Sequence, residues 1–233
     1  WVWRDDTDRV PDYADGVERL SLRHVWLAAR ARYWIDDGSA ALSVRPRRGA
    51  TVVFAGNGVP VHRIGLDDPS VLVSRSQVRE VRRRGRRWTL LLSASSFDYA
   101  VTPRALGYSG PVAEVGMAST DSALSPTATE QAKARLDLPT DRPIVLYAPT
   151  LREPSRIAVS PLLDLDEWAQ RVGDRCYLLL RPHPRERFAV STRLRHAVRD
   201  VSDVDEIGLL LAAADLMVSD FSSLLADAAL VGT

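Results

Sequence analysis

The sequence predicts an α/β fold in which parallel sheets are flanked by helices. Short runs rich in Val, Ile and Leu alternate with longer amphipathic stretches, and this alternation is typical of strand–helix–strand units. A small, polar stretch at 117–127, MASTDSALSPT, interrupts the rhythm before a new helix and strand begin. We therefore expect two Rossmann-like domains, an incomplete one over 1–125 and a truncated one over 126–233.

The expected strands are β-branched or leucine-rich runs that end at polar residues or glycine. In chain order they are RYWI (32–35), TVVFA (51–55), WTLLLS (88–93), VAEV (112–115), IVLYA (144–148), YLLL (177–180) and LMVS (216–219). Because Trp1 opens a strand-like segment and Thr233 directly follows a helix-like run, we expect a fragment of a longer protein.

The expected helices lie between these strands, where apolar residues recur at the spacing of one helix face. They cover 17–31, 76–84, 97–106, 128–136, 166–172, 204–214 and 222–231.

Composition narrows the class of protein and its location. The 233 residues are 45% hydrophobic and 26% charged, which is ordinary for a globular domain, and no apolar run approaches the roughly 18 residues of a membrane-spanning helix. Cys176 is the only cysteine, so intrachain disulfides and cysteine-built zinc sites are excluded. A cytoplasmic location fits best, and the net charge of +1 argues against a general nucleic-acid binder.

One segment is strongly basic. Residues 79–87, REVRRRGRR, hold six arginines and one glutamate. Such a run is either a solvated helix face or a patch that binds anionic lipid or a polyanionic substrate. From this run we predict that an anionic membrane surface is a partner through Arg79–Arg87, and that the protein lies peripherally on the inner face of the plasma membrane.

Polar residues follow three expected strands of the second half. Because ligands of open parallel sheets bind at the carboxyl ends of the strands, these residues are candidates for one site. They are Thr150, Leu151 and Arg152 after the first strand, Arg181, Pro182, His183 and Pro184 after the second, and Asp220, Phe221, Ser222 and Ser223 after the third.

The chemistry of these groups suits an anion. Ser222 and Ser223 would open a helix, where unpaired N–H groups and the helix dipole favour negative charge, although Asp220 or Ser222 as a simple N-cap explains the same residues. Arg181 and His183 alternate with prolines, which restrict the backbone and so hold two cationic donors in place. The alternative interpretation of this segment is a surface turn without a binding role.

Several blocks of the sequence, in order, resemble the CDP-glycerol:poly(glycerophosphate) glycerophosphotransferase family of teichoic-acid-type polymerases. In the second half they are VLYAPTLRE (145–153), LLLRPHP (178–184), VSDVDEIGLLLAAAD (201–215) and DLMVSDFSSLLADAAL (215–230). In the first half ARYWIDDG (31–38), VVFAGNGVPVHRIGLDD (52–68) and VGMASTDSAL (115–124) are similar to its remaining landmarks.

The resemblance implies a GT-B fold, two Rossmann-like domains facing a cleft, that transfers glycerol phosphate from CDP-glycerol to the terminal hydroxyl of a cell-wall polymer and releases CMP. It implies that CDP-glycerol and a polyol-phosphate polymer are the partners. No cofactor, metal or nucleic acid is expected. It implies that Arg181, His183, Ser222 and Ser223 hold the diphosphate, that Thr150, Arg152, Asp220, Gly58 and Asp121 bind substrate, and that His183 stabilises or protonates the leaving phosphate.

One departure bears on activity. The family's W-H-G-T-P block, whose histidine is the expected general base, aligns with Gly56–Pro60, so Asn57 stands at the base position. Asparagine has no basic nitrogen, and losing a general base typically costs about 10²–10⁴-fold in rate. His62 is a poor replacement if 60–66 is helical, because five positions do not match a helical turn.

Three alternatives stay open. A catalytically impaired pseudoenzyme that binds CDP-glycerol or polymer follows from Asn57. Another GT-B glycosyltransferase or a nucleotide-sugar epimerase shares the fold without these blocks. A nicotinamide enzyme is suggested only by Gly56-x-Gly58, and its third glycine position is Val61.

Overall fold

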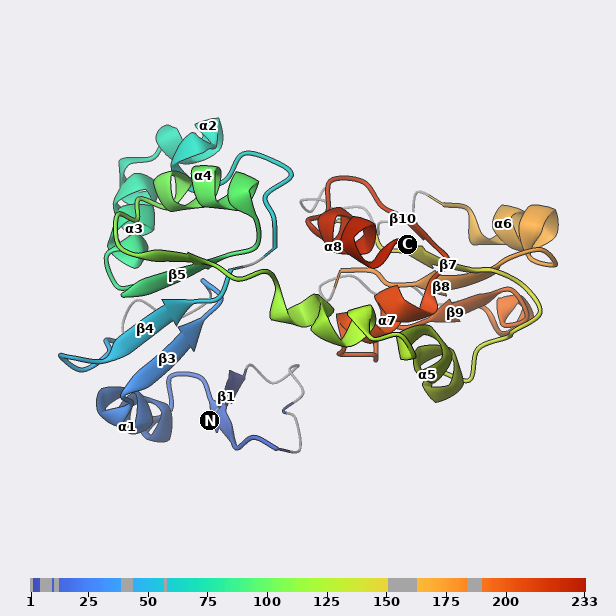
Figure 1. Ribbon diagram of the computed structural model, residues 1–233, viewed down its shortest axis with the longest axis horizontal. Helices are drawn as coiled ribbons and strands as arrows, with labels where there is room; N and C mark the ends of the chain where they lie inside the picture. The colour runs from blue at the N-terminus through green and yellow to red at the C-terminus, as the bar shows by residue number, and fades with distance from the viewer. Residues whose placement is uncertain are drawn as a thin grey trace. The chain divides into compact units, whose positions relative to one another are not determined.

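The computed structural model describes residues 2–4, 10, 13–38, 44–56, 58–150, 163–183 and 190–233 (Figure 1). They form two compact units, 1–116 and 117–233. The division falls at Gly116 rather than after residue 125, because the 3₁₀ helix η2 (Ala118–Leu124) belongs to the second unit. Its Thr120 and Ala123 are buried there, and Gly208 of helix α7 (Ile207–Ala213) approaches Ser119 so closely that a side chain would not fit.

The first unit is a four-stranded parallel sheet in the order β3-β4-β5-β6. Its core lies on one face, where Phe54 stacks on Trp88 with ring centroids 4.2 Å apart. The elements are β3 (Tyr33–Asp36), β4 (Thr51–Phe54), η1 (Gly65–Asp67), α2 (Pro69–Leu72), α3 (Arg75–Gly85), β5 (Leu90–Ser93), α4 (Ser96–Ala105) and β6 (Val112–Glu114). All four strands expected for this half are confirmed within two residues at either end.

The helix expected over 17–31 is wrong at its start. Residues 16–18 form the strand β2 (Gly16–Glu18), which pairs in parallel with β1 (Val2–Arg4), and helix α1 covers Leu22–Arg30. Leu20 adopts a left-handed conformation with φ of 63°, which a helix does not continue through, and the Ser21 hydroxyl then caps α1 by accepting from the His24 N–H.

His24 makes the stability of this turn dependent on pH. Its buried Nδ1 accepts a hydrogen bond from the Leu20 N–H at 2.9 Å, and burial, followed by the charge of Arg19, lowers the pKa of His24. An unfolded histidine titrates near 6.5, so the stabilisation is complete above about pH 6.5 and declines as the pH falls toward the lower folded pKa. In thermal melts from pH 7.5 downward we expect His24→Gln to reduce this loss.

The exposed His196 supplies the matched control for that experiment. His196→Gln measures how far the loss of a histidine elsewhere in the chain changes the melting temperature. Identical pH profiles for wild type and His24→Gln would contradict the assignment.

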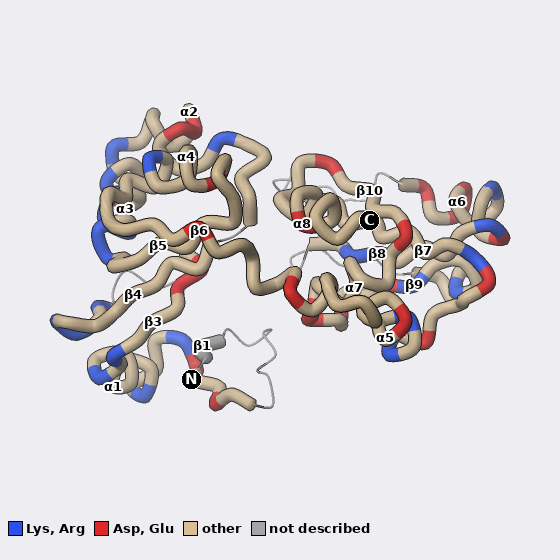
Figure 2. Tube along the Cα trace, in the orientation of Figure 1, with Lys and Arg blue, Asp and Glu red and all other residues tan. Residues whose placement is uncertain are grey.

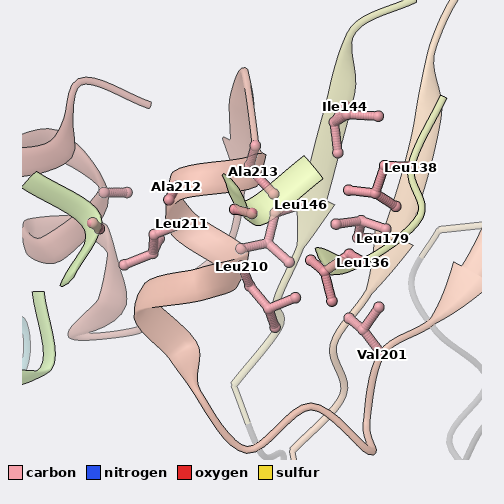
Figure 3. Packing of buried hydrophobic residues seen from close by; sticks show 14 of the residues in the cluster. Leu136, Leu138, Ile144, Leu146, Leu179, Val201, Leu210, Leu211, Ala212 and Ala213 are labelled. Atoms are coloured by element: carbon pink, nitrogen blue, oxygen red, sulfur yellow. The ribbon is translucent and has the colours of Figure 1, made fainter. Parts of the chain in front are cut away.

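The second unit is a parallel sheet in the order β10-β7-β8-β9, with cores on both faces. Figure 3 shows one of them, where Leu146 and Leu179 from the sheet meet Leu210 of α7. The elements are α5 (Ala128–Arg135), β7 (Ile144–Tyr147), α6 (Leu165–Val172), β8 (Tyr177–Leu180), η3 (Thr192–Leu194), β9 (Val198–Asp200), α7 (Ile207–Ala213), β10 (Leu216–Val218) and α8 (Leu224–Val231). The three predicted strands are confirmed, and β9 is additional.

Two helix starts differ from the prediction. Helix α7 begins at Ile207 rather than 204, and α8 begins at Leu224 rather than 222. The spacing estimate for His62 assumed a helix over 60–66. Residues 60–64 are not helical, and the short 3₁₀ helix η1 begins only at Gly65. The helical spacing therefore gives no estimate of where His62 points. Within the described ranges, no helix is both long and apolar enough to cross a membrane.

Candidate functional site

The three candidate segments of the second unit lie at one edge of its sheet. Strand β7 is hydrogen-bonded to β10 on one side and to β8 on the other, and all three run in parallel. Thr150 follows β7, Arg181 and His183 follow β8, and Asp220 to Ser223 follow β10. The carboxyl ends of the strands thus place the described residues of all three segments at one edge of the sheet.

Asp220 joins two of these segments directly. Its Oδ1 accepts hydrogen bonds from the Thr150 N–H at 2.8 Å and from the Thr150 hydroxyl at 2.5 Å, across 70 residues of sequence. The Ser219 hydroxyl adds a bond of 2.6 Å to the Ala148 carbonyl. We call the Asp220–Thr150 pair the latch; it fixes the end of β10 against the end of β7.

The latch also sets the protonation state of Asp220. Desolvation raises its pKa, but hydrogen bonds from the Thr150 hydroxyl and N–H and from the backbone N–H groups of Phe221 and Asp220 outweigh this effect. The net result is a pKa below the ordinary value, so the carboxylate is charged at neutral pH. A fixed negative charge therefore stands beside the proposed anion site, and the latch hydrogen bonds satisfy it.

The two serines at the start of α8 differ in role. The Ser222 hydroxyl, one residue before the N-cap position, accepts from the Leu224 N–H at 3.2 Å and so satisfies one free N–H of the first helical turn. Ser223 holds the N-cap position with helical dihedrals, and its hydroxyl makes no capping bond. Phe221, immediately before them, is 72% exposed. The Ser223 hydroxyl and the positive end of the α8 dipole are therefore the groups at this helix start whose chemistry suits an anion.

Arg181 has a structural task that the sequence did not reveal. Its Nη1 donates to the carbonyls of Val201 and Val204, at 2.8 and 2.5 Å, and so holds the loop between β9 and α7. Burial lowers the pKa of the guanidinium, whereas Asp205, Asp203 and Asp200 raise it. Arg181 therefore shapes the edge of the site and supplies a charge partly balanced by acidic neighbours.

His183 lies two residues beyond Arg181, half-buried at the same edge. Arg152 and Asn57 lie outside the described residues.

Gly58 lies in the first unit, in the loop that leaves β4. Gly56 and Gly58 have φ values of 83° and 82°, a left-handed conformation that favours glycine, on either side of position 57. Asp121 is exposed on η2 and belongs to the second unit, which separates it from the first-half block in which the resemblance placed it.

Two further sets of polar residues were not singled out from the sequence. At the carboxyl end of β5, beside β4, Ser95 caps α4 and the buried Asp98 accepts from the Ala94 N–H at 2.8 Å. In α8 Asp227 is buried and desolvation raises its pKa. Two sequence signals point to these residues: the serine-rich run after the strand for the first set, and an aspartate within an apolar helix for Asp227. Across the ranges that the structure describes, no cluster of His, Cys, Asp and Glu suits a metal ion.

The fold and the site define an α/β protein of two Rossmann-like units, the second of which presents polar and cationic side chains at the carboxyl edge of its sheet. The model of the CDP-Glycerol:Poly(glycerophosphate) glycerophosphotransferase family matches residues 1–231. The chain belongs to this family.

Two curated relatives are similar to most of the chain. The chain is 26% identical over 225 residues to the teichoic acid poly(glycerol phosphate) polymerase of Bacillus subtilis (strain 168), which covers 91% of this chain and 30% of the relative. It is 26% identical over 231 residues to the teichoic acid glycerol-phosphate transferase of Staphylococcus aureus (strain NCTC 8325 / PS 47), covering 91% and 58%. The chain thus spans between about a third and three fifths of these relatives.

Solved structures show the same fold. The wall teichoic acid polymerase TagF superposes with a TM-score of 0.82 at 23% identity, over 96% of this chain and 58% of that one. A TagF variant soaked with CDPG gives 0.81 at 23% identity, over 98% and 58%. The predicted α/β fold of GT-B class is confirmed, and the partial coverage is consistent with a fragment.

Proposed function

We propose that the chain takes part in the transfer of glycerol phosphate from CDP-glycerol to the terminal hydroxyl of a polyol-phosphate polymer, with release of CMP. The observation that carries this proposal is the convergence of Thr150, His183 and the start of α8 on one sheet edge, in a chain of this family. A similar structure was obtained after a soak with CDPG, which supports a CDP-linked donor.

The reaction forms a bond between the polymer hydroxyl oxygen and the β-phosphorus, and breaks the bond from that phosphorus to the bridging oxygen of the diphosphate. The bridging oxygen leaves with CMP, and negative charge builds on it. Positioned cations and N–H donors are the main means of stabilising such charge. We assign this role to Ser223 and the positive end of α8, and to His183 the protonation or stabilisation of the leaving phosphate.

The attacking hydroxyl must lose a proton, and here the chain departs from its family. Asn57 stands where the general base is expected, and asparagine accepts no proton at neutral pH. A second candidate function follows from this substitution: a pseudoenzyme that binds CDP-glycerol or the polymer and turns over slowly or not at all. Both candidates share the donor site in the second unit.

Donor binding is tested first, because it is common to both candidates. In calorimetric titrations with CDP, Arg181→Ala should weaken binding about tenfold or more, beyond any substitution in the first unit. The loss of two carbonyl contacts should also lower stability by about 1–3 kcal/mol. Arg181→Lys keeps the charge and is expected to keep part of the affinity. An unchanged dissociation constant in Arg181→Ala would remove this residue from the site.

We also propose that the donor substrate suffices, without a cofactor or metal, and that the protein works in the cytoplasm at the membrane surface. CDP affinity that is the same in buffer and in excess EDTA is the expected result. A large loss of affinity in EDTA would point to a metal ion at the diphosphate.

A further inference from the structure

Asp220 is held at the edge of the sheet where we place the donor diphosphate. It lies in the loop that joins β10 to α8, where Figure 2 shows an acidic position, and Ser223 at the start of α8 is three residues further on. Oδ1 of Asp220 accepts hydrogen bonds from the N–H and the hydroxyl of Thr150, at 2.8 and 2.5 Å. Because two donors from the end of a neighbouring strand bind one oxygen, the carboxylate has a fixed place beside the start of α8.

The carboxylate carries its charge in a place that water reaches only in part. Asp220 and Thr150 are both half-buried. Desolvation raises the pKa of Asp220, but the hydrogen bonds from Thr150 and from the backbone lower it by more, so the group is ionised at neutral pH. A charge that is partly shielded from water acts more strongly on its neighbours than one at a fully exposed surface. Asp220 therefore acts on the charge of any ligand that is bound beside it.

The positive charge of Arg181 is balanced within the protein. Burial lowers the pKa of its guanidinium, and three aspartates between positions 200 and 205 raise it. The whole unit is acidic as well: residues 117–233 have 13 basic and 17 acidic side chains, net −4, whereas residues 1–116 have 18 and 13, net +5. A unit that bound phosphates by charge alone would carry a basic excess, and this one carries an acidic excess.

Cytidine nucleotides that share a diphosphate differ in charge at its far end. In CDP-glycerol each phosphate is linked on two sides and keeps one ionisable oxygen, so the molecule carries about two negative charges. A terminal phosphate has a second ionisation near about pH 6, so at neutral pH CDP carries about three negative charges and CTP about four. A carboxylate fixed at the site distinguishes these ligands by repulsion, because an unfavourable contact with the wrong ligand is a source of specificity.

We propose that Asp220 is a specificity residue, which selects diphosphate diesters such as CDP-glycerol and repels cytidine nucleotides with a free terminal phosphate. This inference rests on the proposed function, since it takes the donor to lie beside Ser223 and His183. The latch hydrogen bonds hold the carboxylate in place, and the charge of the carboxylate selects the ligand. At the separations found within one site, each added charge on the ligand is expected to reduce affinity about tenfold.

The test is a calorimetric titration with CDP-glycerol, CDP and CTP, without polymer acceptor and in excess EDTA, so that no metal ion neutralises the phosphates. Wild type should bind CDP-glycerol most tightly, CDP about tenfold less tightly and CTP about 100-fold less tightly. In Asp220→Asn the amide oxygen still accepts the hydrogen bonds of the latch, but the charge is removed. The affinities for CDP and CTP should then rise, and the ratio of the CTP to the CDP-glycerol dissociation constant should fall about tenfold or more.

Two control variants separate the charge from the geometry. Thr150→Val removes one hydrogen bond of the latch and keeps the carboxylate charge, so it should weaken the binding of all three ligands by a similar factor and leave their ratios unchanged. Asp174→Asn removes an exposed carboxylate from the turn before β8, at the amino end of that strand, and should change neither the affinities nor their ratios. The order of affinities in wild type needs no variant, so it tests the proposal even if Asp220→Asn does not fold.

Three results would overturn the charge selection: wild type that binds CTP as tightly as CDP-glycerol, Asp220→Asn that changes the three affinities by the same factor, or Asp220→Asn that loses only the affinity for CDP-glycerol. The last result would make Asp220 a ligand of the glycerol hydroxyls. Wild type that binds none of the three nucleotides contradicts the proposed function itself, so a failure of that proposal is distinguishable from a failure of the charge selection.

Discussion

Replacing Asp220 with alanine is expected to weaken CDP binding by about 10- to 100-fold. The reason is the latch: Oδ1 of Asp220 accepts hydrogen bonds from both the N–H and the hydroxyl of Thr150, and without it the loops after β7 and β10 lose these two contacts. Hydrogen bonds to a charged group contribute about 1.5–3 kcal/mol each, which corresponds to this range of affinity. Calorimetric titration with CDP measures the effect.

An opposing effect must be separated from the first. Removing a carboxylate from the neighbourhood of a diphosphate also removes repulsion, which favours binding. Asp220→Asn distinguishes the two effects, because its amide oxygen still accepts both hydrogen bonds from Thr150 but carries no charge. We expect Asp220→Asn to retain or improve CDP affinity while Asp220→Ala loses it.

The partner residue completes this experiment. Thr150→Val removes the hydroxyl donor but keeps the shape, and Thr150→Ser restores the donor. If the latch acts as a unit, Thr150→Val and Asp220→Ala should be less than additive in a double-mutant cycle. Full additivity, or Asp220→Ala with wild-type affinity, would contradict a positioning role.

Restoring histidine at position 57 is expected to raise CMP release by about 10²–10⁴-fold, the usual contribution of a general base. The assay contains CDP-glycerol and a glycerol-phosphate primer, and measures CMP. Gly56 and Gly58, both in left-handed conformation, stay unchanged in Asn57→His, so the side chain at 57 is the only difference in the loop. CDP affinity should hardly change, because the proposed donor site lies in the second unit.

Two controls make the result of Asn57→His interpretable. Asn57→Gln changes the size of the side chain without adding a base and should stay as slow as wild type. His62→Gln tests whether the exposed His62 already supplies the base. Wild type that releases CMP rapidly would rule out the pseudoenzyme, and a gain only in Asn57→His would favour it.

The sequence predicted the sheet of the second unit well because its strands are strongly apolar. Tyr177–Leu180 agrees at both ends and Ile144–Tyr147 agrees to one residue, since runs with buried faces on both sides are almost continuously apolar. Strand β9 escaped prediction because Arg199 and Asp200 make two of its three residues polar. The helix expected over 17–31 failed at Leu20, whose left-handed conformation is rare for leucine.

The sequence predicted which segments lie at the candidate site, but it did not predict which of their atoms form hydrogen bonds. The rule that strand ends of a parallel sheet share one edge placed Thr150, His183 and Ser222 together. No spacing rule predicts the hydrogen bond between Thr150 and Asp220, since 70 residues separate them. None predicts that Nη1 of Arg181 donates to the carbonyls of Val201 and Val204. Such contacts depend on loop conformation, which local patterns leave open.

A structure of the protein with bound CDP tests the central claim most directly. The account predicts that the diphosphate lies at the carboxyl edge of β10-β7-β8, with its oxygens near Ser223 at the start of α8 and near the imidazole of His183. Cytidine without phosphate should bind far more weakly. A diphosphate bound at the opposite edge of this sheet, or remote from both Ser223 and His183, would contradict the account.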